Sequence, residues 1–252
     1  MDFTIELLIL LFLVAVLAGW IDTIAGGGGM ITIPIMLLVG MSPSVAIATN
    51  KLQGSSGTLM ATVFFIKKKE INLKEMRLSI LMTFFGSVFG GWLVLQIRAE
   101  YLIMILPFLL IIIGLYFLLS PNIANEDRPR KISMLLFALT VAPLLGFYDG
   151  FFGPGTGSLI ALAFILLCGY SATRATANAK ILNFTSNFAA LLYFIIFGQI
   201  DWTIGLIMML GQIIGSYIGA KMVLTKGTAL IRPIVVIVCF VMAIKIFLQN
   251  IN

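Results

Sequence analysis

The sequence predicts an all-α polytopic membrane protein, built from two inverted-topology repeats with discontinuous helices and about 8–10 spans. Three observations lead to this fold class. Of the 252 residues, 61% are hydrophobic and only 10% are charged, whereas a soluble domain has about 25% charged residues. Apolar runs recur along the whole chain, and the two halves carry similar motifs in the same order. A water-soluble fold is therefore close to excluded.

Composition also narrows the chemistry. The net charge of +6 does not indicate a nucleic-acid binder, because the basic residues do not gather on one solvated face. The absence of histidine removes histidine-based metal sites and histidine general bases. Cys168 and Cys239 lie in apolar runs, and they give neither a disulfide framework nor a CxxC site. We therefore expect no metal and no cofactor.

The spans are read from the apolar runs, since about 20 apolar helical residues cross a bilayer core. Asp2 and Glu6 at the start of the first run argue against a signal peptide. The run at 30–41 gives only about 18 Å of helix and cannot cross alone. The ten runs are 3–20, 30–41, 45–66, 78–97, 101–119, 132–148, 156–170, 177–197, 203–224 and 230–248.

Two glycine-rich stretches predict broken helices. The four glycines at 26–29 are expected to be non-helical and to lead into a short helix that begins near Met30. Their counterpart is Gly153-Pro154-Gly155-Thr156-Gly157. Non-helical backbone at membrane depth is tolerated only where it is buried in protein or lines a cavity.

An internal repeat divides the chain. Gly19-Trp20-Ile21-Asp22 returns as Gly146-Phe147-Tyr148-Asp149, an offset of 127 residues. The stretch 48–51 returns as 175–180 with two inserted residues, after which the offset is 129. The predicted division is a first transmembrane repeat at 1–120, a cytoplasmic linker at 121–131 and a second transmembrane repeat at 132–252.

Charges predict how the repeats are oriented. The stretch 67–77 is strongly basic, while its counterpart 196–206 has no basic residue and carries Asp201. Conversely, 92–103 has only Arg98, while 221–232 has Lys221, Lys226 and Arg232. Equivalent loops then face opposite sides under the positive-inside rule. This is the pattern of inverted repeats, provided that the short segments count as crossings.

A second topology stays open. If the short segments re-enter instead, the chain has eight spans in two parallel four-span halves. That arrangement leaves the basic stretch 221–232 on the opposite side from 67–77, so we prefer the inverted arrangement.

Lys51 and Lys180 are the most informative single residues, because both lie in apolar spans at equivalent positions of the repeat. A lysine at the centre of a span costs roughly 2.5–3.5 kcal/mol on insertion scales. A lysine pair with no fixed counter-ion makes a site for an anion. The alternatives are that the side chains reach the membrane interface, or that they pair with Asp22 or Asp149.

The residues near the lysines suit an oxyanion. Hydroxyl and amide side chains can hydrogen-bond its oxygens, and backbone N–H groups at a helix N-terminus favour negative charge. The alternatives are helix packing for the small polar residues and a tight turn for the glycines. The candidate substrate-binding residues are Lys51, Lys180, Thr49, Asn50, Asn178, Asn183, Ser186, Asn187, Gly27, Gly28, Gly29, Gly155 and Thr156.

Asp22 and Asp149 occupy equivalent positions just before the glycines. Intramembrane carboxylates often carry protons in transporters, so both are candidates for proton coupling. Pairing with the lysines and capping of the following turn are the other interpretations.

At these motifs the sequence resembles the TauE/SafE family of sulfite exporters, over nearly the whole chain. The resemblance rests on GWIDTIAGGGG at 19–29, Pro34, ATNKL at 48–52, GFYDGFFGPGTGS at 146–158, ANAK at 177–180 and Asn183. It implies a membrane permease for sulfur-containing anions such as sulfite, sulfoacetate or other organosulfonates. Pro154 and Thr156 interrupt the second glycine run, and Ala161 stands where Pro34 predicts proline. The resemblance therefore supports an anion permease more strongly than it supports sulfite.

We therefore expect a secondary transporter of a small sulfur-containing anion in the cytoplasmic membrane, with alternating access around a midplane site. An anion channel, or a transporter of another oxyanion or a carboxylate, is the alternative. An intramembrane enzyme is not expected. The expected partners are a small anionic substrate and the lipid bilayer, with no nucleic acid, and a homo-oligomer is left open.

Overall fold

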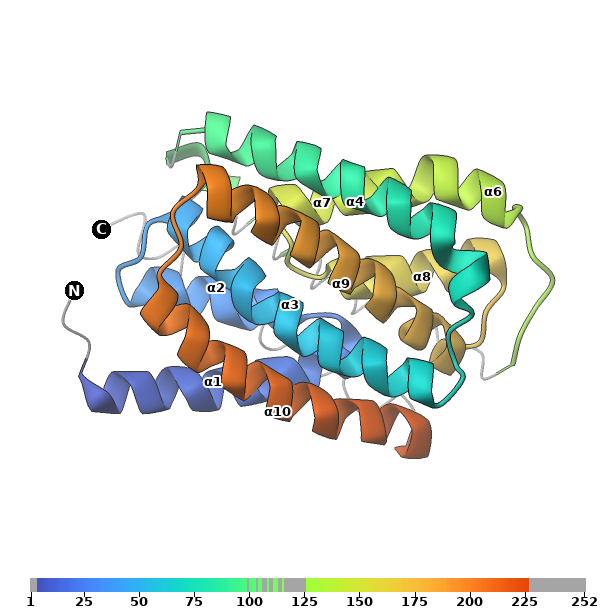
Figure 1. Cartoon of the computed structure of the whole chain (residues 1–252), viewed down its shortest axis with the longest axis horizontal. Helices are drawn as coiled ribbons and strands as arrows, with labels where there is room; N and C mark the ends of the chain where they lie inside the picture. Colours follow the sequence, from blue (N-terminus) through green and yellow to red (C-terminus); the bar gives the residue numbers. More distant parts are fainter. Residues whose placement is uncertain are drawn as a thin grey trace.

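The computed structural model describes residues 4–98 and 126–226, together with 100–102, 104, 105, 108, 111, 112 and 115. Within these residues the chain forms helices and no strand, as predicted (Figure 1). The helices are α1 (Ile5–Ala25), α2 (Gly28–Leu38), α3 (Pro43–Lys67), α4 (Leu73–Gln96), α6 (Met134–Leu136), η1 (Phe137–Val141), α7 (Ala142–Phe151), α8 (Thr156–Cys168), α9 (Ala172–Phe197) and α10 (Trp202–Lys226).

Five described helices are long and apolar enough to cross a membrane: α1, α4, α9, α10 and the continuous helix Met134–Phe151 that joins α6, η1 and α7. Helix α3 is also long, with 25 residues, but polar side chains interrupt its apolar sequence. The predicted run 230–248 and most of 101–119 lie outside the described residues, as do Arg232 and Cys239. The predicted number of spans and the division into three segments therefore stay predictions.

Large apolar side chains cover the outside of the helix bundle. Leu13 of α1, Phe85 and Phe89 of α4 and Leu210 of α10 are all more than half exposed. Polar residues, among them Gln53, Asn183 and Ser216, are instead buried. Apolar exposure this extensive marks a surface that contacts lipid, so the chain is an integral multi-pass membrane protein.

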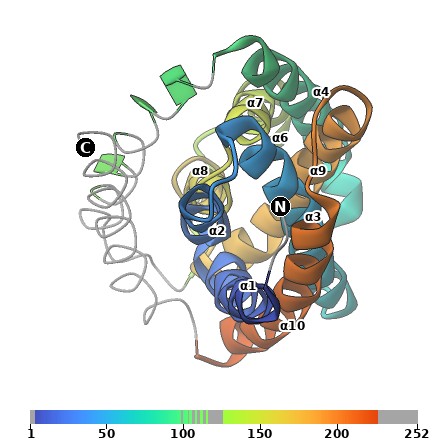
Figure 2. The same ribbon diagram turned by 90° about the vertical axis from the view of Figure 1, so that its left-hand side faces the viewer.

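Glycines let helices of the two halves pack closely. A methyl group on Gly215 of α10 would lie 1.9 Å from the carbonyl oxygen of Val16 in α1. One on Gly86 of α4 would lie 2.1 Å from that of Pro143 in α7. These contacts correspond under the repeat offsets, and Figure 2 shows both pairs of helices side by side. Gly86 and Gly215 are therefore packing residues, as small residues often are between spans.

Both predicted helix breaks are present. Helix α1 ends at Ala25, Gly26 adopts a left-handed conformation (φ 70°), and α2 begins at Gly28. The prediction that all four glycines are non-helical is wrong, because the carboxylate of Asp22 accepts the Gly28 N–H (3.1 Å) and allows the helix to start there. In the second half, residues 152–155 separate α7 from α8, and Gly153 and Gly155 have φ of 95° and 78°.

The short helices turn back rather than continue across the bundle. From its break, α2 runs back to the end of the molecule at which α1 begins, and α8 runs back to the end at which α6 begins (Figure 1). These two ends lie opposite each other in the view. Each short helix returns to the end at which its hairpin started, so the expectation that the short segments count as crossings is wrong. Because the two hairpins start at opposite ends, re-entry does not require parallel halves.

The described basic stretches lie at one end of the molecule. The α3–α4 connection, residues 126–131 and the end of α10 share the right-hand end of Figure 1. Arg130 donates to Glu75 at the start of α4 (2.7 Å), and the rings of Phe64 and Tyr217 bring α3 and α10 together near the same end. This placement agrees with the charge argument, while the orientation of the halves relative to a membrane stays a prediction.

Candidate functional site

The two helix breaks meet inside the bundle. The hydroxyl of Ser158 donates to the carbonyl of Ala25, which is the last residue of α1. A methyl group on Gly157 would lie 2.6 Å from Cα of Gly26, so the backbones of the two breaks touch. The irregular backbone of each half is therefore buried against that of the other, the condition under which such backbone is tolerated in a membrane.

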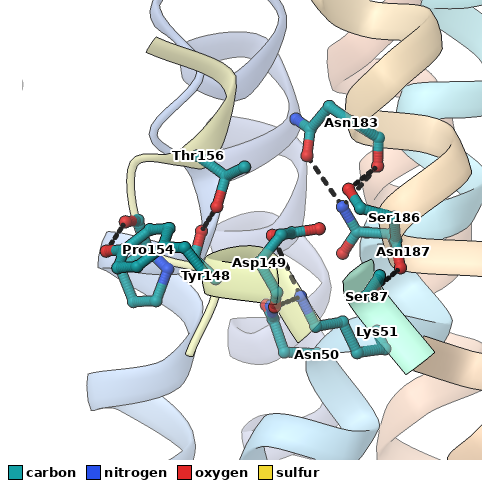
Figure 3. A network of polar contacts seen from close by, with 12 residues as sticks. Asn50, Lys51, Ser87, Tyr148, Asp149, Pro154, Thr156, Asn183, Ser186 and Asn187 are labelled. Carbon is teal, nitrogen blue, oxygen red and sulfur yellow. Dashed lines mark hydrogen bonds and ion pairs between the residues drawn. The ribbon is translucent and has the colours of Figure 1, made fainter. Parts of the chain in front are cut away.

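Each buried lysine pairs with the aspartate of the other half. Lys51 is fully buried, and its Nζ lies 3.0 Å from Oδ1 of Asp149 (Figure 3). Lys180 is 1% exposed, and its Nζ lies 3.1 Å from Oδ2 of Asp22. The two pairs are exchanged between the halves, since Lys51 and Asp22 belong to the first and Lys180 and Asp149 to the second.

The lysines also neutralise helix ends. Lys51 Nζ donates to the backbone carbonyl of Asp149 near the end of α7, and Lys180 Nζ donates to that of Asp22 near the end of α1. Carbonyl groups in the last turn of a helix carry partial negative charge, and that of Asp22 also accepts the Gly26 N–H (2.6 Å). Each ammonium group therefore meets a carboxylate and a helix C-terminus at once.

These contacts correct one premise of the sequence analysis. Lysines without a fixed counter-ion were expected, but both have one, so the pairing alternative describes this structure. The alternative that the side chains reach the interface is wrong, because both are buried. Removing the carboxylate partner of a buried lysine destabilises a protein by about 3–5 kcal/mol. An anion that replaced an aspartate here would therefore be strongly attracted to the unpaired ammonium group.

A small polar cavity lies beside the two pairs. Its volume is about 20 Å³, which is room for one or two water molecules. Among the described residues, those that line it are all polar residues or glycines, and they come from both halves. They are Asp22, Gly26, Gly28, Gly29, Asn50, Gly54, Thr58, Asp149, Gly153, Asn183, Asn187 and Gln212.

Seven of the candidate residues line this cavity. The amide oxygen of Asn50 accepts from Thr32 (2.6 Å) and Gln53 (3.1 Å), which fixes its orientation. Asn187 donates to the side chain of Asn183 (2.8 Å), one turn away on α9. The seven are Asp22, Gly28, Gly29, Asn50, Asp149, Asn183 and Asn187.

Thr49 and Asn178 instead hold loops at opposite ends of the bundle. The Thr49 hydroxyl accepts from the Asp201 N–H (3.0 Å), before α10. The Asn178 amide donates to the carbonyls of Glu70 (3.2 Å) and Arg174 (2.8 Å), close to the α3–α4 connection. Neither is among the cavity-lining residues, so these loop contacts agree with the packing interpretation, and a binding role for Thr49 and Asn178 stays a prediction.

The remaining candidates surround the site without lining the cavity. Thr156 donates its hydroxyl to Gly153 (2.8 Å) within the second break, where Gly155 also lies. Ser186 donates to the Asn183 carbonyl (3.1 Å), and Gly27 lies in the first break. Lys51 and Lys180 do not line the cavity themselves. They bind Asp149 and Asp22, which do.

Part of the lining lies outside the candidate residues. Gly54 and Thr58 line the cavity, and the offset of 129 relates them to Asn183 and Asn187, which were candidates. The repeat therefore held the signal for both. Gln212 had no such signal, because its counterpart Thr83 bonds to the Ala142 carbonyl (3.3 Å) and is absent from the lining.

The predicted anion site at the start of α2 already holds an anion of the chain itself. The Gly28 N–H, which opens this helix, donates to Asp22. Helix N-termini attract negative charge, and here the carboxylate that takes this place also binds Lys180. The start of α2 therefore binds a negative charge as predicted, but in this structure the charge is the carboxylate of Asp22.

Known proteins match this chain over almost its whole length. A family model described as "Sulfite exporter TauE/SafE" matches residues 11–246. A "Probable membrane transporter protein" of Haemophilus influenzae is 50% identical over 245 residues, which cover 97% of this chain and 96% of that protein. The "Probable membrane transporter protein YfcA" of Escherichia coli strain K12 is 52% identical over 244 residues, covering 97% and 91%.

A more distant relative, the "Probable membrane transporter protein YunE" of Bacillus subtilis, is 23% identical over 257 residues. The family match covers the broken helices, both lysine–aspartate pairs and the cavity. The chain therefore belongs to the TauE/SafE family of membrane transporters.

Proposed function

We propose that this protein is a secondary transporter of small sulfur-containing anions, such as sulfite or organosulfonates, in the cytoplasmic membrane. The observation that carries the proposal is the exchange of two buried lysine–aspartate pairs between halves whose broken helices meet at one polar cavity. Broken helices and sites between repeats are typical of secondary transporters. The family description, which names sulfite export, supports the substrate class.

The lysine pairs support alternating access because they join the halves. If one half rocks against the other, the pairs separate and the ammonium groups need new partners. An oxyanion that enters at that moment supplies them, and the amides of Asn50, Asn183 and Asn187 supply hydrogen bonds. We infer that substrate binding and the release of the aspartates are one event.

The lining favours a small, wholly polar substrate. In the part of the chain that the structure describes, no apolar side chain lines the cavity, whereas a site for a drug-sized ligand is mostly apolar. With room for one or two water molecules in this conformation, the cavity must widen for sulfite, and a bulky organic tail would have nothing to pack against.

The first test is anion uptake by the purified protein in liposomes. We expect accumulation of radiolabelled sulfite or sulfoacetate and weaker uptake of sulfate, thiosulfate and simple carboxylates. A thermal-shift screen in detergent with the same anions reports binding independently. Saturating carboxylate uptake without uptake of any sulfur-containing anion would overturn the substrate class.

The second test uses matched lysine variants. Lys51→Gln and Lys180→Gln should each abolish uptake, while Lys74→Gln, on the exposed start of α4, should keep it. A single lysine variant leaves a buried carboxylate unpaired and can lose uptake through misfolding. The double variant Lys51→Gln/Asp149→Asn removes both charges, so its loss of uptake would not result from an unpaired charge. It should fold and remain inactive, and wild-type uptake in it would refute the anion site.

Electrical recording separates a transporter from a channel. A channel built from the same broken helices would pass single-channel currents that do not saturate with anion concentration. We expect saturable flux without such currents.

A further inference from the structure

The two aspartates of the site differ in one respect that the repeat does not predict. Both carboxylate oxygens of Asp22 have partners, since Oδ1 accepts the Gly28 N–H (3.1 Å) and Oδ2 binds Lys180 (3.1 Å). Asp149 binds Lys51 through Oδ1 (3.0 Å), but its Oδ2 is buried and has no hydrogen-bond partner among the described residues. Asp149 is also more deeply buried, at 1% exposure.

The second glycine break explains this difference. Under the offset of 127, Pro154 and Gly155 stand where Gly27 and Gly28 stand in the first half. Gly28 is already helical and directs its N–H at Asp22, whereas Gly155 is left-handed (φ 78°) and α8 starts one residue later. The N–H of Thr156 donates to the Gly153 carbonyl (3.2 Å). The N–H group of Gly28, which binds the second carboxylate oxygen of Asp22, therefore has no equivalent at Asp149.

A buried carboxylate oxygen without a donor is unfavourable, because it has lost water and gained no hydrogen bond. A proton on that oxygen removes the cost and converts it into a donor. Asp149 lines the cavity together with Asn183 and Asn187, and in Figure 3 its carboxylate lies between Lys51 and these asparagines. A proton at Oδ2 is therefore placed to donate to whatever the cavity holds.

The charge balance of the site also indicates that a proton is taken up with the anion. Lys51, Lys180, Asp22 and Asp149 sum to zero, so an entering monoanion leaves one uncompensated negative charge in a buried place. One added proton restores neutrality. It also weakens the bond from Asp149 to Lys51 and frees that ammonium group for the anion.

The charged groups of the described residues that face Asp149 belong to the two ion pairs of the site. Lys51 faces it from α3, while Asp22 of α1 and Lys180 of α9 form the other pair of the site. Helix α4 presents Ser87 to the backbone of Gly150, and its charged residues lie near its start. Helix α8 has no titratable side chain except Cys168 at its far end.

We propose that Asp149, and not Asp22, takes up one proton with each anion, so that the protein couples anion movement to proton movement in the same direction. This inference rests on the proposed function. The proton comes from the aqueous side that the open site faces, binds Oδ2, and leaves from Oδ2 with the anion on the other side. Lys51 changes its partner from Asp149 to the anion.

The test uses isethionate, a sulfonate that stays ionised and therefore cannot carry the proton itself. Protein in liposomes with a trapped pH-sensitive dye reports proton entry while radiolabel reports the anion. We expect wild-type protein to acidify the lumen as isethionate enters. In Asp149→Asn the ratio of protons to isethionate should fall to near zero, so that any remaining isethionate flux carries no acidification and is not driven by a pH gradient. Asp22→Asn should be slower yet still move one proton with each anion.

Difference infrared spectroscopy gives a second measurement that needs no transport. Addition of isethionate should produce the C=O stretch of a protonated carboxyl in wild-type protein and in Asp22→Asn, and Asp149→Asn should lack it. If Asp149→Asn fails to fold, the band in the other two proteins still decides the matter.

The outcomes separate the two proposals. Isethionate flux without acidification in wild-type protein, or a carboxyl band that only Asp22→Asn loses, overturns the role of Asp149 and leaves anion transport standing. Absence of any anion flux in wild-type protein overturns the proposed function and this inference together.

Discussion

Lys180 of α9 and Asp22 of α1 lie 3.1 Å apart, so an ion pair ties the second half of the chain to the helix break of the first. The carboxylate also accepts the first N–H of α2. One aspartate thus connects α1, α2 and α9, and its loss should affect the fold as well as transport.

This relationship predicts a rescue within the pair. Lys180→Gln leaves Asp22 charged beside the cavity, and breaking a buried pair costs about 3–5 kcal/mol, or roughly 10 °C in Tm for a chain of this size. Asp22→Asn/Lys180→Gln removes both charges and should recover at least half of the loss. Thermal unfolding in detergent, followed by the fraction that stays monodisperse, measures it.

Lys221→Gln is the control, because this lysine is exposed on α10 and its Nζ lies over the ring of Tyr217 (4.8 Å) rather than beside a carboxylate. Its Tm should stay near that of the wild type. A double variant no more stable than Lys180→Gln would show that the two charges do not stabilise each other.

Much of this architecture was predictable because a bilayer imposes simple rules. Apolar runs predicted the described long helices, and the glycines at 26–29 and 153–157 predicted breaks. Symmetry predicted that Lys51 and Lys180 are equivalent. Symmetry did not predict which aspartate each lysine binds. Lys51 could pair with Asp22 of its own half or with Asp149 of the other half, and both arrangements obey the repeat equally well.

The remaining differences between the structure and the sequence expectations have local causes. Four glycines suggested a long break, but Asp22 caps Gly28 and shortens it to two residues. Thr49 and Asn178 have the polarity of binding residues, and only their positions nearer the start of each helix direct them to loops. The unpartnered oxygen of Asp149 depends on the φ of Gly155, which sequence spacing does not report.

The contact between the two breaks gives a second prediction. A methyl group on Gly157 would lie 2.6 Å from Cα of Gly26 and 3.3 Å from Nζ of Lys180, so Gly157→Ala must push the breaks apart. Overpacking of this kind costs about 1–3 kcal/mol, and anion uptake should fall strongly.

Gly91→Ala is its matched control, because the added methyl group would only reach ordinary contact distance (3.6 Å) with Tyr193. Uptake in liposomes and Tm should both stay near wild type for this variant. Equal uptake by Gly157→Ala and wild type would mean that the breaks are not closely packed during transport.

The placement of loops predicts the topology. Lys69 lies between α3 and α4 and Ile200 lies between α9 and α10, at opposite ends of the molecule (Figure 1). In a Cys168→Ala/Cys239→Ala background, a membrane-impermeant maleimide added to intact cells should label Lys69→Cys and Ile200→Cys with opposite accessibility. By the positive-inside rule, position 69 should be the protected one.

Labelling after the membrane is made permeable provides the control, since both cysteines should then react. Labelling of both positions in intact cells would place the two loops on the same side, which the parallel arrangement of the halves requires.

The linker predicts an acid-dependent contribution to stability. Asp127 accepts the Ser171 N–H (2.7 Å) and binds Arg174 at the start of α9 (2.7 Å). The hydrogen bond from Ser171, followed by those from Arg174, holds the pKa of Asp127 below its ordinary value of 3.8. A carboxyl group with a lowered folded-state pKa stabilises the fold above its unfolded pKa of about 3.9, and loses that effect as pH falls through the folded value.

Asp127→Asn should therefore lower stability at neutral pH and make little difference in strong acid. Because the side chain of Asp127 is half exposed, the effect is about 0.2–1 kcal/mol, the size expected of a surface ion pair. The measurement is the Tm of the variant and the wild type between about pH 7 and pH 3, where the difference should shrink below about pH 4. Glu126→Gln, one residue earlier and exposed, should leave the Tm unchanged across this range. A difference between Asp127→Asn and wild type that is constant with pH would show that the carboxylate charge does not hold the linker to α9.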